Sequence, residues 1–179
     1  MINSKKHQIA TLFSSFGGQL KRLAVVTLLA VGALGLTAAT SHAETNAKVA
    51  EAMAYLKSEV EKLGAPSVQN GELSFGTTKM NNNFTIVDDV KAKFGSTATL
   101  FAAQDGKFVR ISTNVMKDGA RAVGTNLDPA GPAFAAAKEG NSFYGIVEIL
   151  GKLFDTGYEP VKDAAGAVVG VLYVGYAVE

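Results

Sequence analysis

One stretch decides the fold: residues 97–115, which read TATLFAAQDGKFVRISTNV. Two runs of alternating side chains, 97–104 and 107–115, flank the pair Asp105-Gly106. This pair is preferred in tight type I′ turns, which join antiparallel strands directly. The stretch therefore predicts a β-hairpin, and the remaining elements are placed around it.

The second strand of this hairpin carries the first candidate for ligand binding. Alternation places four of its side chains on one face: Phe108, Arg110, Ser112 and Asn114. A guanidinium on a sheet face is costly unless it is paired, and its fork suits a carboxylate. We therefore expect Arg110 to contact a ligand, with Ser112 and Asn114 as neutral partners beside it. The alternative is an ion pair with an acid of the protein: Asp88, Asp128 or Glu148.

The C-terminal part of the chain predicts three more strands, at 142–150, 153–161 and 167–178. The last is mostly apolar, which indicates a central, buried strand. Between the hairpin and these strands, residues 115–142 read as a loop that contains a short Ala-rich helix. The sum is a PAS-like α+β fold: a curved antiparallel sheet of about five strands with a long N-terminal helix and a loop–helix insert.

The long helix is predicted from an apolar stripe before the hairpin. Its members recur at spacings of 4, 3, 4 and 3 residues: Val49, Met53, Leu56, Val60 and Leu63. Such spacing is typical of one face of an amphipathic helix, and Gly64 and Pro66 end it. The stripe either packs on the domain's own sheet or forms the seam of a dimer.

Between this helix and the hairpin, the sequence predicts only short elements. We expect a strand at 72–75 and another at 84–87. A helix at 89–94 follows, which Asp88 can cap and Gly95 can end.

Residues 1–43 have the composition of an export signal. They contain no acid and four cations: Lys5, Lys6, Lys21 and Arg22. An apolar run at 23–36 precedes a small-x-small triplet that ends at Ala43, as at a cleavage site. The run is shorter than the span of about 18 residues that a membrane helix needs. We predict a signal peptide cleaved after Ala43, then a single domain at 44–179 in the periplasm or outside the cell. The alternative is an uncleaved membrane anchor.

The composition of the predicted mature domain excludes several classes of function. It carries 13 cations and 16 acids, a net charge of −3, and no basic run, so we expect no nucleic-acid partner. Both histidines, His7 and His42, lie in the leader, and the chain has no Cys. This excludes Ser-His-Asp and Cys-His catalysis, His or Cys zinc sites, and disulfides. We also expect no glycosidase activity, since nothing in the spacing of the acids Asp128 and Glu159 marks them as a catalytic pair. We therefore predict a protein that is not an enzyme and that binds neither a cofactor nor a metal.

Several separate motifs together resemble one known family. They are 86–90 (IVDDV), 95–101 (GSTATLF), 108–115 (FVRISTNV), 124–129 (GTNLDP), 142–145 (SFYG), 156–160 (TGYEP) and 170–176 (GVLYVGY). Their order and spacing resemble the Cache sensor domains of bacterial chemoreceptors, in the Cache 3/Cache 2 fusion type. The resemblance covers just over half the chain. It implies the PAS-like fold and a cavity for a small ligand.

The resemblance also implies further site residues. The family often has an aromatic residue at the positions of Tyr144 and Tyr158, and a tyrosine can pack apolar surface while its hydroxyl donates. The insert forms part of the family's cavity, which implies contacts from Arg121 and Thr125. Lys152, in the turn between two strands, is a further candidate. The alternatives are core tyrosines, a surface loop and a solvated lysine.

Two departures from the family are Gly157, where a bulky or basic residue is common, and the small, apolar pair Ile146-Val147 in the strand after Tyr144-Gly145. We expect each of them to widen the cavity or to remove a contact, so the ligand of a relative cannot be carried over.

The resulting hypothesis is an exported sensor domain that binds an organic acid or amino acid and acts with a membrane receptor or kinase. We expect no transmembrane output module in this chain. Related receptor domains pair through their first helix, which implies a homodimer through helix 47–63. The alternative is a protein-interaction module of the same fold without a small ligand. A cavity filled by Phe143, Leu153 and Phe154 would indicate that alternative.

Overall fold

The computed structural model describes residues 33–178, with side chains from residue 47 onward. The predicted leader, residues 1–43, lies for the most part outside the described residues, so its cleavage stays a prediction. No helix in the described part of the chain is long and apolar enough to cross a membrane.

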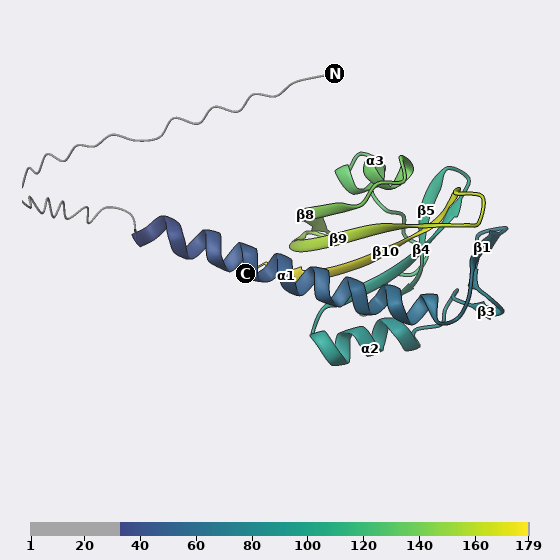
Figure 1. Cartoon of the computed structure of the whole chain (residues 1–179), viewed down its shortest axis with the longest axis horizontal. Coiled ribbons are helices and arrows are strands. Elements are labelled where there is room, and N and C mark those ends of the chain that lie inside the picture. Colours follow the sequence, from purple (N-terminus) through teal and green to yellow (C-terminus); the bar gives the residue numbers. More distant parts are fainter. Residues whose placement is uncertain (1–32, 179) are drawn as a thin grey trace, which may run out of the picture. The chain divides into compact units, whose positions relative to one another are not determined.

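A five-stranded antiparallel sheet forms the centre of the described domain (Figure 1). Its strands are β4 (Thr97–Gln104), β5 (Lys107–Thr113), β8 (Phe143–Ile149), β9 (Lys152–Lys162) and β10 (Val168–Ala177). They lie in the order β5-β4-β10-β9-β8, so the apolar last strand is central, as predicted. The PAS-like α+β fold class is confirmed.

The predicted hairpin is present between β4 and β5. Asp105 and Gly106 have φ values of 49° and 74°, the left-handed conformations that a type I′ turn needs at both positions. The chain therefore reverses in two residues at the point where the sequence indicated.

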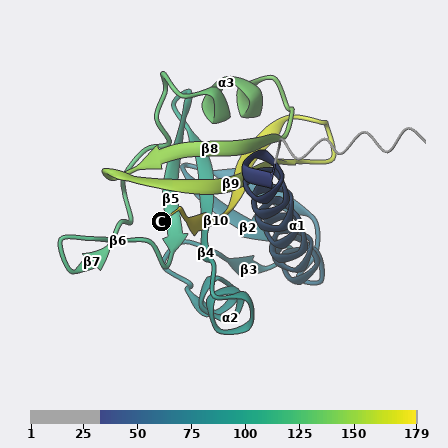
Figure 2. The same ribbon diagram turned by 90° about the vertical axis from the view of Figure 1, so that its left-hand side faces the viewer.

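Helices cover both faces of this sheet (Figure 2). Helices α1 (Ala33–Glu61) and α2 (Thr85–Phe94) pack with one face into one apolar core. Helix α3 (Pro132–Lys138) packs with the other face into a second core. The predicted stripe of α1 is buried in the first core, with its members Val49, Met53, Leu56 and Val60 all at most 1% exposed. The stripe therefore packs on the domain's own sheet and is not a dimer seam.

The region before the hairpin differs from its prediction. Residues 84–87 were expected as a strand, but Thr85 already begins α2, and Asp88 lies inside the helix rather than at its cap. The β-branched Ile86 and Val87 favour a strand in isolation, but Val87 and Val90 are three residues apart and both fully buried. Burial of this helical stripe therefore outweighs the local propensity. The predicted end of the helix is confirmed, because Gly95 takes the left-handed conformation at φ 72°.

Two small sheets accompany the central one. Strands β1 (Pro66–Gln69), β2 (Glu72–Phe75) and β3 (Thr78–Lys79) form a meander, of which only β2 was predicted. Strands β6 (Met116–Lys117) and β7 (Ala120–Arg121) form a short hairpin within the insert. These strands are only two to four residues long, which is too short for a clear alternation in the sequence.

A β-bulge in β5 determines which residues share a face. Leu100 pairs with Ser112, but the next residue, Phe101, pairs with Arg110, so Ile111 is an extra residue in the ladder. Arg110 therefore lies with Phe101 on the α3 side, whereas Ser112 lies with Leu100 on the α2 side. The prediction that Arg110 and Ser112 share one face is wrong, because strict alternation does not hold across a bulge.

Candidate ligand-binding site

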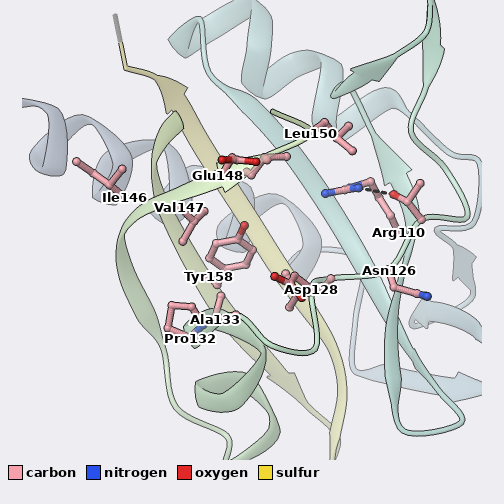
Figure 3. A pocket seen from close by; sticks show the side chains of 14 residues that line it. Arg110, Asn126, Asp128, Pro132, Ala133, Ile146, Val147, Glu148, Leu150 and Tyr158 are labelled. Atoms are coloured by element: carbon pink, nitrogen blue, oxygen red, sulfur yellow. Dashed lines mark hydrogen bonds between the residues drawn. The ribbon is translucent and has the colours of Figure 1, made fainter. Parts of the chain in front are cut away.

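A cavity of about 340 Å³ lies on the α3 side of the sheet (Figure 3). Its lining comes from Arg110 of β5, the loop 125–128, the start of α3 at 131–133, the hairpin segment 146–150 and Tyr158 of β9. Segments that are far apart in the sequence therefore meet around one space. Its volume lies within the range of about 300–1,000 Å³ that is common for small-molecule sites.

The insert loop is held against the edge strand β5. The backbone N–H of Arg110 donates to the carbonyl of Thr125 over 2.8 Å, and the N–H of Leu127 donates to the carbonyl of Phe108 over 2.9 Å. Val109 and Asn126 also form an isolated antiparallel bridge. The loop thus pairs with β5 through its backbone, as a short additional strand would. This pairing fixes Thr125 beside Arg110 and places the loop over the cavity.

Arg110 is a buried cation in the wall of this cavity. Its side chain is 4% exposed, and its guanidinium carbon lies 4.9 Å from the ring centroid of Phe101. Nη1 donates to the hydroxyl of Thr125, which in turn donates to the carbonyl of Ala122. Nε has no hydrogen-bond partner. Burial lowers the pKa of this guanidinium from its ordinary value, since the charged form loses hydration.

No carboxylate of the described residues pairs with Arg110. Asp88, one of the three predicted partners, binds Arg121 instead, with Nη1–Oδ1 at 2.8 Å and Nη2–Oδ2 at 2.9 Å. Asp128 and Glu148 line the cavity but form no ion pair with Arg110. The guanidinium therefore borders the cavity without a carboxylate partner, and among the described residues only Thr125 and the ring of Phe101 stabilise its charge.

Arg121 does not reach the cavity. Besides its ion pair with Asp88, it donates to the carbonyl of Thr113 over 2.8 Å, and its guanidinium carbon lies 4.3 Å from the ring centroid of Phe84. These contacts fasten the β6–β7 hairpin to α2. Arg121 does not line the cavity, since the short hairpin directs it toward α2, so this geometry lends no support to its predicted role as a second cation.

Tyr158 supplies a hydroxyl to the cavity. Tyr158 is 3% exposed. The centroid of its ring lies 4.9 Å from the ring centroid of Tyr173 and 6.3 Å from that of Phe143. Figure 3 shows the hydroxyl directed into the space that Arg110 borders. Desolvation raises the pKa of Tyr158 well above its usual range, so the phenol stays protonated and can donate.

Ser112 and Asn114 have structural roles on the other side of the sheet. The hydroxyl of Ser112 donates to the carbonyl of Asn83 over 2.6 Å. The amide of Asn114 accepts from the N–H of Ala98 over 2.8 Å and donates to the carbonyl of Val87. Both side chains tie the sheet to the α2 region. Neither lines the cavity, so their predicted contacts with a ligand are not supported.

Tyr144 also lies on the face opposite the cavity. Its hydroxyl donates to Glu159 over 2.7 Å, and Glu159 is in turn paired with Lys57 of α1 at 3.1 Å. A Cβ at Gly157 would lie 2.6 Å from the Tyr144 ring and 3.1 Å from Val49. Gly157 therefore makes room for Tyr144 beside α1 and does not widen the cavity, contrary to the expectation.

Two remaining candidates are also placed apart from the cavity. Lys152 begins β9, is exposed and is absent from the cavity lining. The acids Asp128 and Glu159 lie on opposite sides of the sheet, so they cannot act as a catalytic pair. Among the described residues there is also no cluster of three or more potential metal ligands.

With this geometry established, comparison with known proteins gives the family. The family model of the Cache 3/Cache 2 fusion domain matches residues 9–179. The chain belongs to this family. No curated protein matches the sequence significantly. Cache domains are non-catalytic sensors of small ligands outside the membrane.

Within this Cache domain, sequence reasoning found the polar part of the cavity and missed most of its apolar wall. Arg110, Thr125 and Tyr158 were predicted, and all three line the cavity, as does the apolar pair Ile146-Val147. The part of the wall that was not predicted is formed by the side chains of Leu127, Ala133, Ile149 and Leu150. The only signal available was alternation within 143–149, where Val147 and Ile149 share a face with Phe143. That alternation does not say that the face borders a cavity rather than a filled core.

Proposed function

We propose that this Cache domain senses a small organic anion, whose negative group binds the guanidinium of Arg110. One observation carries the proposal: a nearly fully buried arginine borders a cavity and has no carboxylate partner among the described residues. A buried unpaired charge costs several kcal/mol. A ligand carboxylate would offset this cost through charge-assisted hydrogen bonds.

The neighbours of Arg110 support this role. Thr125 has no donor left for an anion, because its hydroxyl accepts from Arg110 and gives its only hydrogen to the carbonyl of Ala122. It therefore acts as a positioning residue that fixes one arm of the guanidinium, and it is not itself a ligand contact. Nε of Arg110 is buried from solvent, so Nη2, for which the described residues offer no hydrogen-bond partner, and the hydroxyl of Tyr158 are the donors that remain for the ligand.

The competing hypothesis, an interaction module without a ligand, predicted a cavity filled by three side chains. Leu153 is 51% exposed and outside the cavity, while Phe143 and Phe154 pack in the second core and do not line the cavity. The cavity is thus open to a ligand, which favours small-molecule sensing.

The location and the partner of the domain belong to the same proposal. The acid-free leader with its apolar run supports export to the periplasm or beyond, with cleavage after Ala43. A domain that binds ligand there would act on a membrane receptor or kinase. The loop 125–128 and α3 are the elements that a bound ligand would contact and stabilise. A partner that recognises these elements would therefore distinguish the ligand-bound domain from the free one.

The direct test is isothermal titration calorimetry of the full chain against a panel of organic acids and amino acids. Arg110→Met should abolish the binding of any hit, while Arg121→Ala serves as a matched control, because its guanidinium lies outside the cavity. Equal affinities of the wild type and the Arg110→Met variant would refute the proposed role of Arg110. A panel without any hit would argue against small-anion sensing.

A further inference from the structure

We propose that the edge strand β8 is an interface to which a second copy of this chain adds its own β8. The two strands run antiparallel about a two-fold axis at Ile146, so the two central sheets become one continuous sheet. This proposal concerns the rim of the sheet and does not rest on the ligand site at Arg110.

The first argument is the direction of the backbone groups of β8. A two-residue turn joins β8 to β9, and its residues Leu150 and Gly151 have φ values of 51° and 82°. In such a type I′ hairpin the residues that flank the turn, here Ile149 and Lys152, exchange both of their backbone hydrogen bonds. Alternation then turns the N–H and C=O groups of every second residue outward, away from β9. These residues are Tyr144, Ile146 and Glu148.

No residue in the described part of the chain pairs with these outward groups. β8 is the last strand in the order β5-β4-β10-β9-β8, and no backbone hydrogen bond joins its outer side to a turn or loop. The opposite edge of the sheet differs, because loop 124–127 bonds to β5 through the backbone of Phe108 and Arg110. The chain therefore covers one edge of its central sheet and leaves the other open to a further strand.

The second argument is that β8 lacks the usual protection of an edge strand. Natural edge strands are commonly protected by lysine, proline, a bulge or short length. β8 has seven residues, neither lysine nor proline, and an uninterrupted register with β9. Its central residue, Ile146, lines the cavity but is 47% exposed, and Figure 3 shows its side chain directed away from Val147 and Tyr158. Covering Ile146 with a second strand removes apolar surface from water.

The third argument is that β8 is complementary to itself. Pairing about Ile146 sets this residue against its own copy, and it sets Tyr144 against Glu148 of the second copy. All outward groups then meet a partner, which gives about six hydrogen bonds between the strands. The only charged residue of the strand faces a tyrosine, so no like charges lie directly opposite each other. Because each copy uses the same surface, the assembly closes at two copies.

The first experiment is sedimentation velocity of the full chain at concentrations up to about 100 μM, which would reveal a dimer of micromolar affinity. The wild type should sediment as a dimer. Ile146→Lys sets two lysines against each other at the two-fold axis, so it should weaken the dimer about tenfold or more. Met116→Lys is the matched control, because Met116 is 53% exposed in β6, and this variant should leave the dimer unchanged.

Hydrogen exchange followed by NMR tests whether the dimer forms through the backbone of β8. In the wild type, the amides of Tyr144, Ile146 and Glu148 should exchange about tenfold more slowly at high protein concentration than at low concentration. In Ile146→Lys they should exchange equally fast at both concentrations. The amides of Val147 and Ile149, which bond to β9, should stay protected in this variant and so show that the hairpin is still folded.

Two outcomes would overturn the proposal. A wild type that stays monomeric at the highest concentration would leave β8 open for a strand of a different protein instead of a second copy. A dimer that Ile146→Lys leaves intact, or one in which the outward amides of β8 exchange as fast as in the monomer, would place the contact between copies on another surface.

Discussion

Replacing Arg110 with methionine should make the domain more stable while it removes the cation of the proposed ligand site. Arg110 is 4% exposed, and within the described residues its guanidinium lacks a carboxylate partner and its Nε lacks a hydrogen bond. Arginine stays charged at neutral pH, so the folded protein bears the full cost of removing that charge from water, several kcal/mol.

Two contacts of Arg110 offset part of this cost. A hydrogen bond from a charged group, here to Thr125, contributes about 1.5–3 kcal/mol. The position over the ring of Phe101 adds about 2 kcal/mol when desolvated. Methionine has a similar length and no charge, and Thr125 keeps its bond to Ala122. We therefore expect Arg110→Met to raise the free energy of unfolding by about 1–3 kcal/mol.

Urea denaturation monitored by circular dichroism measures this change, and Tm should rise by about 2–4 °C for each kcal/mol in a domain of this size. Arg110→Lys is the matched control, since it keeps a buried charge and should not stabilise. The reasoning would be refuted if the methionine variant lost about 1 kcal/mol or more in its free energy of unfolding, which is the usual size of the loss when a buried contact is removed. Such a loss would mean that groups of the protein itself already compensate the charge and the hydrogen-bond donors of the guanidinium.

Three further predictions concern residues outside the cavity. Asn114→Ala leaves buried backbone groups, including the N–H of Ala98, without partners, so urea denaturation should show a loss of about 2–3 kcal/mol; an unchanged midpoint would contradict this. Arg121→Ala removes a partly exposed ion pair and should cost about 1 kcal/mol with unchanged ligand affinity, whereas a large loss of affinity in calorimetry would return Arg121 to the site. Gly157→Ala brings a Cβ to within 2.6 Å of the Tyr144 ring and should cost about 1–3 kcal/mol. Adding Tyr144→Ala should recover most of this loss, and no recovery would assign the clash to other neighbours.

The elements of this domain were predictable where the signal is local. The Asp105-Gly106 turn, the stripe of α1, the Gly95 helix end and the apolar last strand all follow from residues within one or two turns of each other. Predictions from local strand propensity were wrong where the packing of the side chains favoured another conformation. Ile86 reads as part of a strand, yet α2 forms there because Val87 and Val90 can be buried together only as a helix.

The site was less predictable, because it depends on which side chains a fold brings together. Alternation placed Ser112 beside Arg110, but one extra residue in the ladder, Ile111, turns Ser112 to the opposite face. The sequence offered several acids as partners for Arg110. Only the structure shows that Asp88 is already bound to Arg121, which leaves Arg110 unpaired.

Local sequence was enough to predict the strands of the central sheet, the Asp105-Gly106 turn and the cation in the cavity. Periodicity and turn chemistry are properties of neighbouring residues, so they can be recognised without the fold. The tertiary structure alone decided which charges are neutralised and which face a cavity. Pairing and desolvation depend on distances between residues far apart in the chain, such as Asp88 and Arg121 or Arg110 and Tyr158, and those distances exist only once the chain has folded.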